Sequence, residues 1–146
     1  MKITILVPIY NDWKSVFKLL EEINSKIHGL DYYFSIIIVN DASNEQRSIY
    51  APNLENIQSI KIINMKKNRG HARCIAAGLK YIFDNEEFDY VIPMDGDGED
   101  RPEEIKNFVE HINYTPEKTV VAERVKRSEN LFFKFCYTIH KILTLT

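Results

Sequence analysis

Residues 91–105 read VIPMDGDGEDRPEEI, an apolar run that passes directly into a cluster of carboxylates and then into a second apolar pattern. The run from Tyr90 to Met94 is short, apolar and β-leaning, which is typical of an interior strand of a parallel sheet. From Ile105 onward the apolar positions recur at helical spacing. The stretch therefore predicts a buried strand, a tight acidic turn and a helix.

The turn concentrates acidic side chains within six positions, at Asp95, Asp97, Glu99 and Asp100. Carboxylates this close repel one another unless a cation or solvent offsets their charge. Gly96 lets the backbone bend tightly and leaves room for a ligand beside the main chain. Hard oxygen ligands on a flexible turn suit Mg²⁺ or Mn²⁺ bound together with a phosphate-bearing substrate.

A second interpretation of the turn needs no ligand. Asp100 and Glu103 have the spacing of a capping box, and Pro102 suits the first turn of a helix. The turn could thus be a solvated acidic segment whose Asp100 caps the next helix. Because short acidic turns are common, the D-x-D pattern alone leaves both interpretations open.

The rest of the chain alternates strand and helix patterns. Short apolar runs predict strands at 3–7, 34–39, 57–63 and 119–122, the first of them closed by Pro8. Apolar positions at helical spacing predict helices within 16–27, 72–83, 105–112 and 131–145. This order predicts a three-layer α/β fold, with a mostly parallel sheet and helices on both faces.

Size and composition fit one domain with a core and exclude several classes of protein. The chain has 146 residues, 45% of them hydrophobic, and a net charge of −2, which gives no general basis for nucleic-acid binding. The cysteines and histidines lack metal-ligand spacing, so a metal held by nitrogen or sulfur is not expected. The sequence has no visible signal peptide and no apolar run long enough to span a membrane, so we expect a cytosolic setting.

Two common nucleotide-binding signatures are missing. No G-x-G-x-x-G follows the first predicted strand, and G-x-x-x-x-G-K-[ST] does not occur. A dinucleotide dehydrogenase and a P-loop enzyme are therefore disfavoured. Polar residues instead follow each of the first four predicted strands, at the edge of the sheet where α/β proteins bind ligands.

These polar segments, taken in order, carry a resemblance to a known family. They read PIYND at 8–12, VNDAS at 39–43, NRGHARCIAAG at 68–78 and DGDGEDRPE at 95–103. In order and spacing they resemble the patterns V-P-x-Y-N-E, V-D-D-x-S, N-x-G-x-x-x-A-x-x-x-G and D-x-D of family 2 inverting glycosyltransferases with the GT-A fold. The last segment looks like the D-A-D-L-Q-D-P-P-E of the polyprenyl-phosphate sugar synthase branch. Asn40, Gly98 and Glu99 depart from these patterns.

The resemblance implies roles on the nucleotide side of the site. Pro8 and Tyr10 would line the base and ribose, with Asp12 standing where the family has glutamate. Asp41 would accept a hydrogen bond from the base, and Arg69 would contact the nucleotide. Without the resemblance, Asp41 fits equally well an Asx-turn that closes its strand, and Arg69 a solvated loop residue.

The resemblance also implies a metal on the sugar diphosphate. Asp97, helped by Asp95 and Glu99, would hold Mg²⁺ or Mn²⁺ there, with Gly96 close to the donor. Arg124, in the basic loop 123–128, matches an arginine that this branch places near the diphosphate. Charge complementarity supports that role, and a merely solvated basic loop is the alternative.

The implied reaction is transfer of a hexosyl unit with inversion, from a nucleotide-diphosphate sugar to a polyprenyl phosphate or a glycan. A phosphate acceptor is already ionised and needs no general base, so no catalytic residue is assigned. We expect a nucleotide-sugar-binding core at 1–128, and a helix at 129–146 that either contacts a membrane surface through 131–145 or packs as a core helix. An exposed apolar stripe on that helix would favour homo-oligomers.

The family usually continues into acceptor-side strands beyond the position where this chain stops, so the sequence suggests a truncated domain or a reduced homologue. Two rival functions remain. One is a nucleotidyltransferase, which also uses paired aspartates but would want a glycine-rich loop after the first strand. The other is a degenerate nucleotide-binding domain without turnover.

Overall fold

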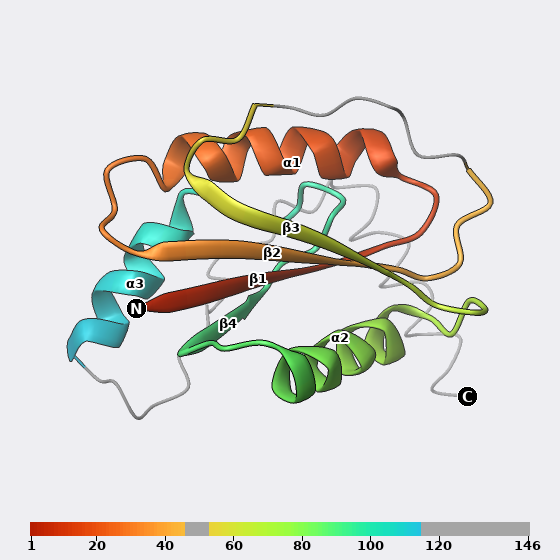
Figure 1. Ribbon diagram of the computed structural model, residues 1–146. Coiled ribbons are helices and arrows are strands. Elements are labelled where there is room, and N and C mark those ends of the chain that lie inside the picture. Colours follow the sequence, from red (N-terminus) through yellow and green to blue (C-terminus); the bar gives the residue numbers. More distant parts are fainter. Residues whose placement is uncertain (46–52, 115–146) are drawn as a thin grey trace, which may run out of the picture.

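The computed structural model (Figure 1) describes residues 1–45 and 53–114. Its centre is a four-stranded sheet in the order β3-β2-β1-β4, in which every neighbouring pair is parallel. The strands are Lys2–Ile9 (β1), Tyr33–Asn40 (β2), Ile57–Asn64 (β3) and Tyr90–Pro93 (β4). The predicted parallel sheet is confirmed, as are the four strands that fall in the described part.

Helices cover both faces of this sheet, so the predicted three layers are confirmed (Figure 1). The helices are Trp13–Lys26 (α1), His71–Asn85 (α2) and Glu104–Tyr114 (α3). Odd-numbered side chains of β1, from Ile3 to Ile9, pack with α1 and α3 in the larger core cluster. On the opposite face Leu6 packs with Cys74 and Ile82 of α2 in the smaller cluster.

The first strand is longer than the sequence predicts. Pro8 was expected to end it, but β1 runs through Pro8 to Ile9. Along β1 the backbone groups of successive residues point alternately toward β2 and toward β4. The Ile9 carbonyl accepts from the Asp41 N–H on the β2 side, and the Leu6 carbonyl accepts from the Met94 N–H on the β4 side. The ring nitrogen of Pro8 therefore faces the β4 side, beyond the last Leu6–Pro93 pair, where no ladder bond is lost.

Helix α2 lies unusually close to the sheet at Gly78. A Cβ on this buried glycine would come within 2.4 Å of Leu6 Cδ1 and 2.8 Å of Val39 Cγ2. Such distances are well below van der Waals contact, so only glycine fits without displacing its neighbours. This close approach sets the height of α2 above β1 and β2.

Three predictions fall outside the described residues. They are the strand at 119–122, the basic loop 123–128 with Arg124, and the helix within 129–146. In the described part of the chain, none of the helices has the length and apolarity that a membrane crossing requires.

Candidate functional site

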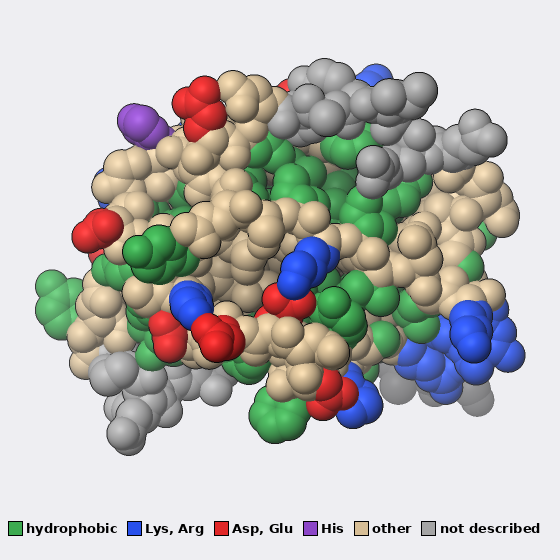
Figure 2. Space-filling view, viewed as in Figure 1, with side chains coloured by type: hydrophobic (Ala, Val, Ile, Leu, Met, Phe, Trp, Pro, Cys, Tyr) green, Lys and Arg blue, Asp and Glu red, His purple; other side chains and the backbone are tan. Residues whose placement is uncertain are grey.

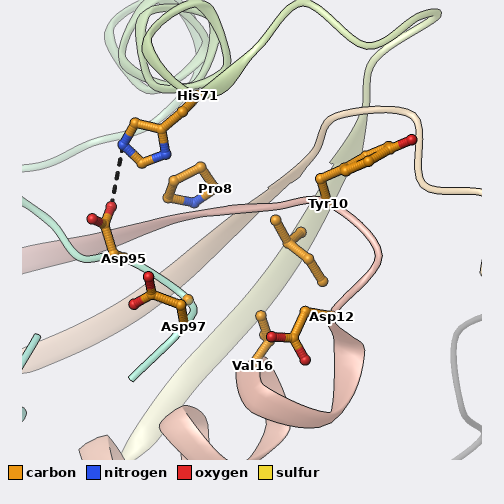
Figure 3. Close-up of a pocket in the computed structure, with 9 residues that line it drawn as sticks. Pro8, Tyr10, Asp12, Val16, His71, Asp95 and Asp97 are labelled. Atoms are coloured by element: carbon orange, nitrogen blue, oxygen red, sulfur yellow. Dashed lines mark ion pairs between the residues drawn. The ribbon is translucent and has the colours of Figure 1, made fainter. Parts of the chain in front are cut away.

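A pocket of about 180 Å³ opens at the carboxyl ends of β1 and β4 (Figure 3). It brings together most of the residues that the sequence predicts for the site, and it is lined by Pro8, Ile9, Tyr10, Asp12, Val16, His71, Asp95, Gly96 and Asp97. In Figure 3, His71, Asp95 and Asp97 lie on one side of the pocket, with Tyr10 and Asp12 on the other. Its volume is below the 300 Å³ or so of a typical small-molecule site, so it can enclose only part of a ligand of that size.

The acidic turn is held in shape by its own side chains. Asp100 Oδ2 accepts a hydrogen bond of 2.7 Å from the backbone N–H of Asp95, and Asp97 Oδ1 accepts one of 2.9 Å from the N–H of Glu99. The proposed capping role of Asp100 is wrong, because α3 begins only at Glu104 and the Asp100 carboxylate closes the turn instead. The turn thereby presents Asp95 and Asp97 to the pocket.

Gly96 lies against the backbone of β1. A Cβ there would come within 3.0 Å of Val16 Cγ2 and 3.1 Å of the Pro8 carbonyl oxygen. The glycine therefore lets the acidic turn pack directly on the strand end that carries Pro8. This contact places the carboxylates of the turn beside the residues that follow β1.

His71 joins helix α2 to the acidic turn. Its Nε2 lies 3.2 Å from Oδ1 of Asp95, as the dashed line in Figure 3 marks. Partial burial raises the pKa of Asp95 above its ordinary value; His71 opposes this, and the carboxylates of Asp100 and Asp97 add to it. The sequence interpretation missed His71, although it lies within the NRGHA segment, because a histidine without ligand spacing gave no signal of its own.

The opposite side of the pocket comes from the segment that follows β1. Tyr10 is 47% exposed, so its ring is available to a ligand. Asp12 has two roles, because it lines the pocket and its Oδ1 also accepts from the Ser15 N–H as the N-cap of α1. Asp12, and not the neighbouring Asn11, is therefore the cap of this helix.

Asn11 links the segments after β1 and β2. It adopts a left-handed conformation with φ of 52°, which asparagine tolerates better than most residues. Its Oδ1 accepts from the backbone N–H of Asn44 at 2.7 Å and of Glu45 at 3.2 Å, while its own N–H donates to Ser43 Oγ. The sequence interpretation did not assign Asn11 this linking role.

Asn40, which departs from the family pattern, uses both ends of its amide. Its Nδ2 donates to Oδ1 of Asn64 on the neighbouring strand at 2.9 Å, and its Oδ1 accepts from the Ser43 N–H. Asn40 therefore ties the end of β2 to the end of β3.

Asp41 is buried, with 3% of its surface exposed, and it holds the segment between β3 and α2. Its Oδ1 accepts from the Arg69 N–H at 2.8 Å, and its Oδ2 accepts from the Gly70 N–H at 2.8 Å. Asp41 and Arg69 lie outside the set of residues that line the pocket. The hydrogen bond from Asp41 to the base stays a prediction, and the structure adds these two backbone partners.

Cations gather where β3 runs into α2. Figure 2 shows a cluster of Lys and Arg side chains at this end of the molecule, where the exposed cations are Lys66, Lys67, Arg69 and Arg73. No acidic residue occurs between Asn64 and Arg73. The resulting positive charge favours the approach of a phosphate-bearing ligand to the neighbouring pocket.

The metal ligands that the resemblance implies lie close together in sequence but differ in placement. Asp95 and Asp97 line the pocket, whereas Glu99 is exposed outside its lining. Among residues 1–45 and 53–114, no three His, Cys, Asp or Glu side chains form a group arranged to hold a metal ion. Two pocket carboxylates are oxygen donors of the kind that Mg²⁺ and Mn²⁺ take together with substrate phosphates.

The sequence model of the family described as Glycosyl transferase family 2 matches residues 4–141. Among curated proteins, a dolichol-phosphate mannosyltransferase of Pyrococcus furiosus is 26% identical over 126 residues, which are 86% of this chain and 34% of that protein. An undecaprenyl-phosphate 4-deoxy-4-formamido-L-arabinose transferase of Proteus mirabilis is 32% identical over 111 residues, 74% of this chain and 32% of that protein. The chain thus spans about a third of the length of these two curated relatives.

Solved structures show the same fold. TarS from S. aureus, residues 1–349 in complex with UDP-GlcNAc, matches with a TM-score of 0.58 and 22% identity, over 88% of this chain and 38% of that one. A longer TarS structure matches with a TM-score of 0.60 and 19% identity, over 88% of this chain and 24% of that one. These likenesses extend over most of the chain and confirm the predicted GT-A architecture.

Proposed function

Since the chain belongs to glycosyl transferase family 2, we propose that it binds a nucleotide-diphosphate sugar and takes part in moving the hexosyl unit, with inversion, to an acceptor. The observation that carries this proposal is the shared pocket. Asp95, Gly96 and Asp97 line it from the turn after β4, and Pro8, Tyr10 and Asp12 line it from the segment after β1. Acids beside an apolar and aromatic wall suit the two chemically different ends of such a donor.

On the nucleotide side, Pro8 and the exposed Tyr10 are proposed to contact base and ribose, with Asp12 hydrogen-bonding nearby. Arg69 and the neighbouring cations are proposed to attract the phosphates. Arg124, which lies outside the described residues, is proposed to join them at the diphosphate. The pocket lining itself contains no lysine or arginine, so cations that pair with the phosphates would come from the basic segment beside it.

On the phosphate side, Asp95 and Asp97 are proposed to hold Mg²⁺ or Mn²⁺, with Glu99 nearby. The oxygen donors present fit either ion, provided that the donor's own phosphates complete the coordination. A divalent cation at this position offsets the negative charge that develops on the leaving nucleoside diphosphate. The two carboxylates would hold that cation, and the turn that Asp100 closes keeps them in place.

The acceptor is proposed to be a polyprenyl phosphate, with a glycan as the other option. The support comes from two relatives whose names specify dolichol phosphate and undecaprenyl phosphate. A phosphate oxygen attacks as an anion, so the chain need not supply a general base for that reaction. Such an acceptor would place the protein at the cytosolic face of a membrane, in contact through residues 131–145.

The test is a thermal-shift titration of the whole chain with UDP, GDP and their sugars, with and without Mn²⁺. A nucleotide at 100 times its Kd stabilises the folded state by about 2.7 kcal/mol, which raises the Tm by several degrees. We expect a metal-dependent rise for one nucleotide class, and no such rise for Asp97→Ala. No rise in the wild type with any nucleotide would contradict the proposal.

The matched control is Glu110→Ala. Glu110 is an exposed acid on α3, away from the pocket lining, so its removal changes the net charge by the same amount as Asp97→Ala. We expect this variant to keep the full metal-dependent rise. An equal loss in both variants would show that net charge, rather than the pocket carboxylate, causes the effect.

A further inference from the structure

Asp41 is placed to act on the pocket without lining it. It is almost fully buried at the end of β2, and its two carboxylate oxygens bind two successive backbone N–H groups, those of Arg69 and Gly70. Charge-assisted hydrogen bonds of 2.8 Å to a buried carboxylate are among the stronger ones in proteins. Asp41 therefore fixes the backbone at one point, immediately before helix α2.

That point determines where His71 lies. Gly70 has φ of 85° and ψ of 159°, a conformation that glycine reaches freely, and its carbonyl accepts the first helical bond, from the Cys74 N–H. The next residue, His71, lines the pocket and reaches Asp95 with its Nε2. A carboxylate at the end of β2 is thus connected, through a single peptide segment, to the acidic turn after β4.

The alternative is a purely structural role, in which Asp41 only satisfies buried backbone groups. Gly70 already has a second acceptor, because its N–H also lies 3.2 Å from Asn68 Oδ1. Both carboxylate oxygens of Asp41 accept from the N–H groups of the two residues just before His71. This arrangement relates Asp41 to the pocket that His71 lines.

We infer that Asp41 is a positioning residue: it holds the Arg69–Gly70 backbone so that His71 stays over the pocket, beside Asp95, and binds the diphosphate side of the donor. This inference rests on the proposed nucleotide-sugar function and adds to it. It assigns Asp41 an effect on donor affinity through His71, separate from the hydrogen bond to the base that the family resemblance implies.

The test uses Asp41→Asn, which keeps the size of the side chain but replaces one acceptor oxygen by an amide that faces an N–H donor. The control is Thr4→Val. Thr4 is also buried, with 1% of its surface exposed, on the same sheet, and it hydrogen-bonds Ser35 far from the pocket. Amide hydrogen exchange and the imidazole resonances of His71 are recorded by NMR, and UDP and GDP binding with Mn²⁺ by calorimetry.

We expect Asp41→Asn to speed exchange of the Arg69 and Gly70 amides about tenfold, to shift the His71 resonances, and to weaken nucleotide binding about tenfold, with the sheet amides still protected. Thr4→Val should change none of these three. In a His71→Ala background, Asp41→Asn should weaken binding by less, because the residue through which it acts is gone.

The outcomes separate this inference from the proposed function. Unchanged amide exchange and unchanged His71 resonances in Asp41→Asn would overturn the inference, whatever the nucleotide result. The inference would also be overturned if Asp41→Asn left nucleotide binding intact. The same holds if Asp41→Asn weakened binding as much in the His71→Ala background as in the wild type. If the NMR changes occur while wild type binds no nucleotide, the proposed function fails and the holding of His71 by Asp41 stands.

Discussion

Nε2 of His71 lies 3.2 Å from Oδ1 of Asp95, so the first residue of α2 meets the first residue of the acidic turn after β4. The two residues follow strands that are not neighbours in the sheet. His71 comes after β3 and Asp95 after β4, and β2 and β1 lie between these two strands. The pair therefore joins α2 to the acidic turn on one side of the pocket.

Removing His71 should weaken donor binding more than it weakens the fold. The side chain is exposed and lines the pocket, so its loss leaves little core unfilled, but it takes away the partner of Asp95. We expect His71→Ala to raise the nucleotide Kd about fivefold, an effect of about 1 kcal/mol. Calorimetric titration measures it, with His111→Ala on the exposed side of α3 as the control that should leave the Kd unchanged.

Gly96→Ala should damage the site through the backbone. The new Cβ would lie 3.0 Å from Val16 Cγ2 and 3.1 Å from the Pro8 carbonyl, which pushes the acidic turn away from β1. We expect the metal-dependent thermal shift to be lost. Adding Val16→Ala frees the side-chain contact but not the carbonyl contact, so the double variant should not regain the shift. A full recovery would mean that only the valine clash matters.

Gly78→Ala should destabilise the fold even though alanine is the better helix former. Alanine gains about 1 kcal/mol of helix propensity, while overpacking against Leu6 and Val39 costs roughly 1–3 kcal/mol. We expect a net loss of about 1 kcal/mol in urea unfolding. In contrast, the exposed Ala76→Gly in the same helix should lose about 1 kcal/mol through propensity alone. A stabilised Gly78→Ala would refute the close approach of α2.

Cys74 should make stability depend on pH in the alkaline range. Burial, with a smaller contribution from Asp41, raises the pKa of its thiol from 9.0 to about 11. The unfolded chain therefore loses this proton at lower pH than the folded protein, and the contribution to stability falls as pH rises from about 9 to about 11, by at most about 3 kcal/mol.

The measurement is urea unfolding of wild type and Cys74→Ser between pH 8 and pH 11. A serine hydroxyl can still donate to the Val39 carbonyl, as the Cys74 thiol does, but does not ionise in this range. The difference in unfolding free energy between the two proteins cancels the other titrating groups. It should be constant below pH 9 and should change in favour of serine above it; a flat difference would contradict the prediction.

Much of the fold could be predicted because its signals are local. Apolar residues from Val16 to Ile27 recur at helical spacing, and the run from Phe34 to Val39 is continuous, so helix and buried strand follow from short windows of sequence. The acidic turn could also be placed at the ligand-binding edge, since any polar segment after a parallel strand lies there.

The errors and omissions arise where a distant part of the chain decides. Pro8 continues its strand because β4 has already stopped pairing beside it. Asp100 closes a turn instead of capping α3 because the N–H of Asp95 is within reach. His71 gave no signal because its partner lies in another loop. No window of sequence contains these relationships.

Strand β4 pairs with β1 over four residues, and within the described residues it forms one edge of the sheet. Its outward backbone groups form a row onto which another extended segment can add. A segment added there would run alongside the strand that ends in Asp95 and Asp97. It would be tied by backbone hydrogen bonds to the strand that carries the two pocket carboxylates, so a displacement of the added segment would also displace Asp95 and Asp97.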